Sequence, residues 1–213
     1  MRFSKETRII LLISILVPFV LIYVDEPVLR WIREFHKVNP DIGQLLRFGD
    51  KIMYYAAHGT TLIVGTIMVY LYGRYFDKRF QYIGKPLFIG LATSGISVQI
   101  IKHLIGRARP RISDSLVIIG PSLQGGYDSF PSGHSAMAFC LAAILSQCYP
   151  RYWIPFYFFA LLEGFARIDG TSHFPADVLA GAIVGTVVAN LVKMKLQQSD
   201  EIAGKGGDLH NLD

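Results

Sequence analysis

The sequence is poor in charge and in cysteine. Of its 213 residues 17% are charged and 52% are hydrophobic, and the mean hydropathy is +0.38. Soluble domains carry about 25% charged residues, so this composition argues against a soluble domain and predicts that much of the chain contacts lipid. The only cysteines, Cys140 and Cys148, fall in one apolar segment. We expect them to be small core residues without a disulfide.

The first apolar run lacks the small-residue cleavage site of a signal peptide. A basic segment, Met1–Arg8, precedes the run Ile9–Val24, and the polar residues Asp25 and Glu26 follow it. A secretory signal would end in small residues. We therefore expect an uncleaved first membrane span.

The sequence has no internal repeat, but it has six apolar runs near the length of about 20 residues that a membrane span needs. They are Ile9–Val24, Ile52–Tyr72, Leu87–Ile105, Gly133–Tyr149, Tyr152–Ala166 and Phe174–Val192. The fold class predicted is all-α, a polytopic membrane helix bundle with six transmembrane helices in residues 1–196. A polar, glycine-rich tail, 197–213, is predicted to be disordered.

Between the first two runs lies a mixed stretch, Asp25–Lys51. Its apolar residues recur at helical spacing, and Asn39-Pro40 interrupts them. This pattern is typical of short amphipathic helices on the membrane surface.

The basic residues suggest a topology. If six spans alternate, the cations before the first span, in the second loop and after the last span lie on one side, which places both termini in the cytoplasm. The net charge of +5 favours anionic headgroups or substrates. Nucleic acid is not expected as a partner, because the cations flank apolar runs and form no single patch.

Charge gathers at the end of the third run, which carries Lys102, Arg107, Arg109 and Arg111. Charge at a span end is costly unless it serves a purpose. Lys102 and Arg109 are seven residues apart, so a helix that continues to Pro110 would place both on one face. Taken alone, the cluster is equally consistent with a basic helix end that meets lipid headgroups.

The fourth run begins with the sequence Pro131-Ser132-Gly133-His134. Ser132 is placed as a helix N-cap, and the free N–H groups of a helix start form an anion site that Gly133 leaves open. Taken alone, this element is better explained as a Pro/Ser/Gly turn with an incidental histidine, because caps of this composition are common.

The third element, Arg167 to Asp177, joins the fifth and sixth runs. His173 and Asp177 are four residues apart and can meet on one helical face. A carboxylate that holds Nδ1–H leaves Nε2 free to attack. The alternative is a His–Asp pair that caps a helix.

If the spans alternate, all three elements reach the same membrane face. Cations, a helix N-terminus and two histidines then meet in one place. Phosphoryl transfer needs such a set, because cations and N–H groups stabilise the phosphate oxygens while one group attacks and another protonates the leaving oxygen.

These elements resemble the signature of the type-2 phosphatidic acid phosphatase superfamily. Lys102 to Pro110 matches K-x6-R-P, the second element matches P-S-G-H, and Arg167 to Asp177 matches R-x5-H-x3-D, in the family's order. The resemblance implies a nucleophile, its partner and a general acid: His173, Asp177 and His134. It also implies a set of phosphate-binding residues and no metal or other cofactor. The phosphate-binding residues are Lys102, Arg109, Ser132, Gly133 and Arg167.

One position departs from the family's pattern. Ala166 stands where the family usually has serine, so one polar contact to phosphate is absent. We expect a changed rate rather than lost activity.

The resemblance implies a metal-independent lipid phosphatase in the cytoplasmic membrane, with a site that faces the exterior. Its substrate would be undecaprenyl pyrophosphate, phosphatidylglycerol phosphate, phosphatidic acid or lipid A 1-phosphate. One alternative is a lipid-to-lipid phosphotransferase that uses the same phosphohistidine. Vanadium haloperoxidases share the motifs but are soluble. A transporter would scatter its charges near mid-bilayer, whereas here they gather at span ends.

Overall fold

The computed structural model describes residues 15–209 of the chain, with side chains as far as residue 198. Over this range the regular structure is helical, as predicted, and residues 15–23 are a helix ahead of α2. The elements are α2 (Asp25–Val38), α3 (Pro40–Ala56), α4 (Gly59–Tyr75), α5 (Lys78–Ile105), α6 (Gly133–Cys148), the short 3-10 turn η1 (Pro150–Tyr152), α7 (Trp153–Asp169) and α8 (Pro175–Leu209).

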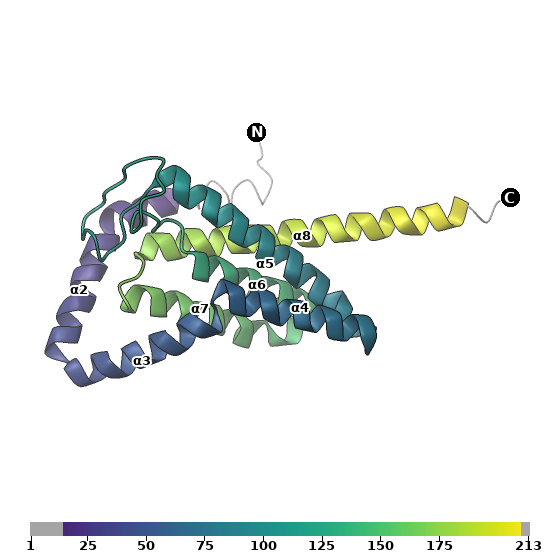
Figure 1. Cartoon of the computed structure of the whole chain (residues 1–213), viewed down its shortest axis with the longest axis horizontal. Helices are drawn as coiled ribbons and strands as arrows, with labels where there is room; N and C mark the ends of the chain where they lie inside the picture. The colour runs from purple at the N-terminus through teal and green to yellow at the C-terminus, as the bar shows by residue number, and fades with distance from the viewer. Residues whose placement is uncertain (1–14, 210–213) are drawn as a thin grey trace.

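The helices form a bundle with α6 inside it (Figure 1). Helix α6 packs against α8, α7 and α5, and α4 packs along α5. Helices α2 and α3 and the loop between α5 and α6 gather at one end of the bundle, while the C-terminal part of α8 extends beyond the other end (Figure 1). The end that carries α2 is also the end where α5 finishes and where α6 and α8 begin.

The count of six membrane spans is not confirmed. In the described part of the chain, α5 and α8 are long and apolar enough to cross a membrane, and α3 with α4 makes a third span if the two are one bent element. Helices α6 and α7, which match the fourth and fifth predicted spans, have only 16 and 17 residues. The predicted first span, Ile9–Val24, lies partly outside the described residues.

The second predicted span, Ile52–Tyr72, is wrong as a continuous helix. Its first residues belong to α3, and α4 starts only at Gly59, with a bend of 45° between the two helices. His58 is extended, at φ −62° and ψ 134°, and the glycine that follows it is a poor helix former. The predicted break at Asn39-Pro40 is confirmed, since Pro40 opens α3.

Helix α5 starts earlier than the predicted third span and ends with it, at Ile105. It begins at Lys78, where the Asp77 side chain caps Arg79 N. It does not continue to Pro110, because its C-cap residue, Gly106, has left-handed backbone angles, φ 62° and ψ 47°. A Cβ there would lie 2.0 Å from the carbonyl oxygen of Gly120, so only glycine fits this turn.

Helix α8 passes close to α6 through two glycines. A Cβ on Gly181 would lie 2.4 Å from Ser132 O, and a Cβ on Gly185 would lie 2.1 Å from Ala136 O. The pair is spaced four residues apart, the arrangement by which small residues bring membrane helices into backbone contact. This packing fixes α8 against the first turns of α6. The helix continues to Leu209, beyond the predicted boundary at residue 196, and the division between bundle and tail stays a prediction.

The contact predicts a cost for any side chain at Gly185. Gly185→Ala should destabilise the bundle by about 1–3 kcal/mol, because the added methyl overlaps the α6 backbone. Gly65→Ala in α4 is the matched control, since nothing lies within 4 Å of its Cβ position. Thermal unfolding in detergent should show a lower Tm for Gly185→Ala and an equal or higher Tm for Gly65→Ala. Equal Tm values for Gly185→Ala and wild type would contradict the close approach.

Candidate active site

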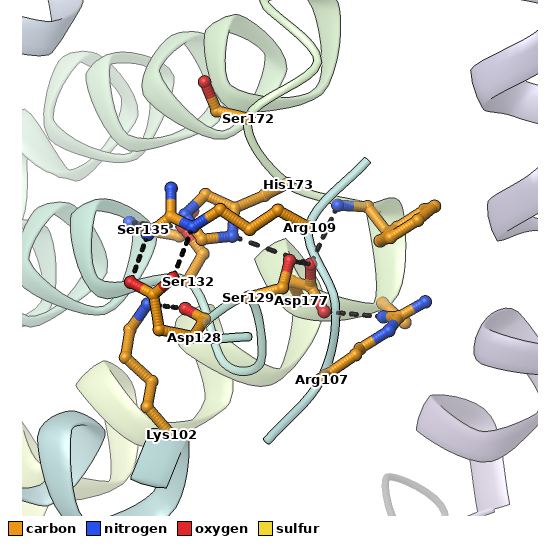
Figure 2. Close-up of polar contacts among 12 residues, drawn as sticks. Lys102, Arg107, Arg109, Asp128, Ser129, Ser132, Ser135, Ser172, His173 and Asp177 are labelled. Carbon is orange, nitrogen blue, oxygen red and sulfur yellow. Dashed lines mark hydrogen bonds and ion pairs between the residues drawn. The ribbon is translucent and has the colours of Figure 1, made fainter. Parts of the chain in front are cut away.

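Four helix ends meet at the α2 end of the bundle. They are the C-terminus of α5, the N-terminus of α6, the C-terminus of α7 and the N-terminus of α8. Figure 2 shows that this junction brings together Lys102, Arg109, Ser132, His173 and Asp177. Residues from three separate sequence elements therefore converge on one place.

Ser132 caps α6, as predicted. Its hydroxyl accepts from Ser135 N at 3.4 Å and from Ser135 Oγ at 3.0 Å. Its own N–H donates to the carbonyl of Asp177 at 2.8 Å, which ties the start of α6 to the start of α8. The next N–H groups belong to Gly133 and His134, at the positive end of the helix dipole. This geometry suits an anion.

Asp128 holds two of the predicted phosphate-binding cations. Arg109 donates to both of its carboxylate oxygens, from Nε at 2.9 Å and from Nη2 at 2.7 Å, and Lys102 Nζ donates to its backbone carbonyl (Figure 2). The Lys102 side chain also passes Gly133, whose Cβ position lies 4.0 Å from Lys102 Cε. Lys102 and Arg109 thus meet although Arg109 lies beyond the end of α5, which corrects the expectation of one continuous helix.

The charge at Asp128 is stable across ordinary pH. The hydrogen bonds from Arg109 are the largest influence, and with the nearby charges of Arg109 and Lys102 they hold the pKa of the Asp128 carboxyl far below its usual range. Asp128 therefore stays ionised and keeps Arg109 in one orientation. A bidentate pair of this kind is stronger and more directional than a single contact.

His173 and Asp177 lie next to each other, but not on one helix. His173 precedes α8, and Asp177 sits in its first turn. The His173 Nδ1 atom is 3.6 Å from Asp177 Oδ2 (Figure 2), slightly longer than a hydrogen bond. The exposed fractions of the two side chains are 3% and 0%. Asp177 Oδ2 also accepts from Ser129 Oγ at 2.6 Å and from Phe174 N at 2.9 Å.

The environment keeps the His173 imidazole neutral. Burial is the main cause that lowers the pKa of His173 to about 4, and the positive charges of Lys102 and Arg109 act in the same direction. The negative charge of Asp177 opposes this shift. Because histidine is neutral above its pKa, His173 has a free lone pair at neutral pH, which a nucleophile requires.

Arg167, in the last turn of α7, has three restraints. Its Nε is 2.9 Å from Glu163 Oε1, so the predicted pairing of these residues is confirmed, although the N–H direction is that of an ion pair rather than a hydrogen bond. Its Nη2 donates to Asp50 O at 3.0 Å, and its Cζ lies 5.4 Å from the ring centroid of Tyr54. The Arg167 side chain is 5% exposed, and its guanidinium has a fixed orientation.

His134 faces the break between α3 and α4. Its ring centroid is 5.0 Å from that of Tyr54 and 5.7 Å from that of His58. Its Nε2 is buried and has no hydrogen-bond partner among residues 15–198. The positive charges of Arg167 and Lys102 act on this ring, so His134 belongs to the same cluster.

The structure thus gathers every predicted site residue at one junction, and their chemical roles stay predictions. It adds residues that the sequence analysis did not assign: the counterions Asp128 and Asp25, the hydroxyl of Ser129, and Arg107. Only Arg107 gave a signal, as a member of the basic cluster. Among the described residues, no three His, Cys, Asp or Glu side chains are grouped as a metal site.

Comparison with known families agrees with this geometry. A family model described as the PAP2 superfamily matches residues 83–200, which is more than half of the chain. The chain belongs to the PAP2 superfamily. The predicted resemblance is confirmed, and all three signature elements, from Lys102 to Asp177, lie inside the matched stretch.

Several relatives of this PAP2 protein are named as phosphatases of lipid A. The Rhizobium johnstonii "Lipid A 1-phosphatase" is 31% identical over 160 residues, which is 68% of this chain and 62% of that protein. The Rhizobium etli "Lipid A 1-phosphatase" is 35% identical over 108 residues, 49% of this chain and 47% of that protein. The chain therefore spans about half to three fifths of the length of these curated relatives.

Two crystal structures have the same fold. Aquifex aeolicus LpxE superposes with a TM-score of 0.57 at 25% identity, over 76% of this chain and 93% of that chain. A PAP2-type phosphatidylglycerolphosphate phosphatase from Bacillus subtilis superposes with a TM-score of 0.64 at 21% identity, over 92% of this chain and 98% of that chain. At this identity the second likeness concerns the fold alone.

The burial of His173 predicts its titration. The Cε1 proton of His173, assigned by its absence in His173→Ala, should titrate well below the ordinary histidine pKa of about 6.5, near the value of about 4 that burial produces. The measurement is an NMR titration of the protein in detergent. A His173 midpoint at or above the ordinary value would contradict the neutral, buried imidazole.

Proposed function

We propose that this protein is a lipid phosphatase of the PAP2 superfamily that works through a phosphohistidine at His173. The observation that carries the proposal is the junction itself. A buried neutral imidazole beside a carboxylate faces two cations and the N-terminus of α6. A phosphate placed there has a nucleophile on one side and charge stabilisation around it.

The first half-reaction transfers the phosphoryl group to the enzyme. Lys102, Arg109 and Arg167 bind the non-bridging oxygens, with hydrogen bonds from the first N–H groups of α6. His173 Nε2 attacks phosphorus, the bond from phosphorus to the leaving oxygen breaks, and His134 gives a proton to that oxygen. Asp177 keeps the Nδ1 side of the attacking ring oriented toward itself.

The second half-reaction releases phosphate. A water molecule loses a proton to His134 and attacks phosphorus, and the bond from phosphorus to His173 breaks. Inorganic phosphate leaves, and both histidines return to their starting states. His134 serves as an acid in the first step and as a base in the second, because the same position lies next to the leaving oxygen and then next to the attacking water.

An apolar groove beside the site supports a lipid as substrate. The groove has a volume of about 660 Å³ and runs between α4, α5 and α6 from His134 and Gly133 past Met137 and Ile96. Ile96 is 64% exposed on the outer surface of the bundle, so the groove opens on the side of the bundle that would face lipid. A hydrocarbon tail in this groove would leave its phosphate next to His134.

The names of the relatives favour lipid A 1-phosphate among the possible substrates. Both Rhizobium relatives are named for it, and a Bacteroides thetaiotaomicron relative, 29% identical over 123 residues, is named "Lipid A 4'-phosphatase". We place the protein in the cytoplasmic membrane with the site facing the exterior, because the cations at the turn between α4 and α5, Arg74, Lys78 and Arg79, and those in the distal part of α8, Lys193 and Lys195, then face the cytoplasm.

The nucleophile is tested by a pair of histidine variants. His173→Ala should reduce phosphate release at least about 1,000-fold, since no other nucleophile replaces the imidazole. His103→Ala is the control, because the His103 side chain bonds to its own helix at Gln99 O and lies outside the cluster. Phosphate release is measured in detergent on purified lipid A 1-phosphate, phosphatidic acid, phosphatidylglycerol phosphate and undecaprenyl pyrophosphate.

Near-normal turnover in His173→Ala would refute the mechanism. Failure of the wild type to release phosphate from every lipid of this panel would refute the function. Transfer of phosphate to a second lipid, with none released to water, would favour the phosphotransferase.

The groove is tested by blocking it. Ile96→Trp should raise KM or lower kcat/KM for the lipid about tenfold or more, since a bulky indole would occupy the space assigned to the tail. Hydrolysis of a small soluble aryl phosphate should stay within about twofold of wild type. Leu161→Trp, at a similarly exposed position on α7, is the matched control. Equal losses on both substrates would show that the groove does not bind the tail.

A further inference from the structure

Arg107 stands out among the cations of the site because it does not face the phosphate-binding cluster. It lies one residue after the cap of α5, and its side chain is 1% exposed. Lys102 and Arg109 both contact Asp128, whereas Arg107 lies on the other side of Asp177 (Figure 2). Its role is therefore different from theirs.

Arg107 joins two buried carboxylates. Its Nη1 donates to Asp177 Oδ1 at 2.6 Å, and its Nη2 donates to Asp25 Oδ2 at 2.6 Å. The guanidinium carbon lies 4.1 Å from the ring centroid of Phe174. The backbone carbonyl of Arg107 accepts from Ser129 N at 3.0 Å. These contacts hold both the guanidinium group and the backbone of Arg107 in place.

Asp25 completes the arrangement from a distant part of the sequence. It opens α2, and its side chain is 3% exposed. Its second oxygen accepts from Ala176 N, in the first turn of α8, at 2.8 Å. Asp25 therefore holds Arg107 and the helix start that carries Asp177 at the same time. The three charges alternate as carboxylate, guanidinium and carboxylate.

The two oxygens of Asp177 have separate partners. Oδ1 accepts a hydrogen bond from Arg107. Oδ2 accepts from Ser129 Oγ and Phe174 N, and it faces His173. With Oδ1 held by a guanidinium, the carboxylate cannot rotate about its bond without losing a buried ion pair. A buried charge that loses its partner is strongly destabilised, so the oxygen that faces His173 has a fixed position.

We propose that Arg107, held by Asp25, is a positioning residue for the phosphoryl-transfer reaction: it fixes Asp177, and through Asp177 it orients the His173 imidazole for attack. This inference rests on the proposed phosphatase function. Arg107 does not contact the phosphate. It acts on the rate of attack and not on substrate affinity.

The test separates positioning from phosphate binding and from general stability. Arg107→Ala should lower kcat about 100-fold, the scale expected when a reacting group is misplaced by about 1 Å. KM and the inhibition constant of inorganic phosphate should stay within about threefold of wild type, because Lys102, Arg109 and Arg167 are untouched. Added methylguanidinium should restore part of the lost kcat by occupying the vacated space between Asp25 and Asp177.

Arg33→Ala is the matched control. Arg33 also fastens the loop between α5 and α6, through Pro110 O at 2.7 Å and the Asp114 carboxylate, but it does not contact Asp177. Its removal should leave kcat within about threefold of wild type, and methylguanidinium should not change it. Tm and gel filtration of every variant report whether the fold is kept.

If Arg107→Ala does not fold, Arg107→Lys and Asp25→Asn carry the test. Each keeps part of the arrangement, and each should lower kcat about tenfold or more, at unchanged phosphate inhibition. Unchanged kcat in these variants, or a rise in the phosphate inhibition constant that matches the loss of kcat, would overturn the positioning role. An inactive wild type would instead overturn the proposed function, and the positioning role with it.

Discussion

The site depends on the hydrogen bonds and the ion pair that the Asp177 carboxylate makes. The carboxylate is fully buried, and it accepts from Arg107, from the Ser129 hydroxyl and from Phe174 N while it faces His173. Its backbone carbonyl also accepts from Ser132 N, at the start of α6. One residue in the first turn of α8 therefore positions the proposed nucleophile, His173, on one side and the start of α6, the proposed anion site, on the other.

Burial of charge near a membrane is costly, and the chain offsets this cost by pairing. Arg107 meets two carboxylates, Arg109 meets Asp128, and Arg167 meets Glu163. Pairing also restricts rotation, so the cations keep their orientation before any phosphate arrives. Preorganised charges of this kind stabilise a transition state without a reorganisation cost.

Glycines at helix contacts and at a helix end determine where these charges lie. Gly181 and Gly185 let α8 approach α6 closely. Gly106 turns the chain at the end of α5, and beyond this turn the side chains of Arg107 and Arg109 contact different carboxylates. Small residues therefore decide which charged groups meet. The apolar groove then borders the site on the side of α4, α5 and α6.

Local sequence signals predicted much of the candidate site. The Ser132 cap and the Glu163–Arg167 pair follow from spacing along one helix, and the all-α class follows from the apolar runs. The counterions could not be predicted, because Asp25 and Asp128 reach their arginines through tertiary packing that no periodicity encodes. The apolar run predicted the end of α5 at Ile105, but it gave no sign that Arg109 reaches Lys102 from beyond the helix, and the break at His58 has no proline to mark it.

The covalent phosphohistidine is tested most directly by the stereochemistry at phosphorus. A lipid phosphorothioate made chiral with oxygen isotopes is hydrolysed in isotopically labelled water, and the configuration of the released thiophosphate is determined. Attack by His173 followed by attack of water inverts phosphorus twice, so retention of configuration is predicted. Inversion would mean that water attacks the substrate in a single step, and it would contradict a phosphohistidine at His173.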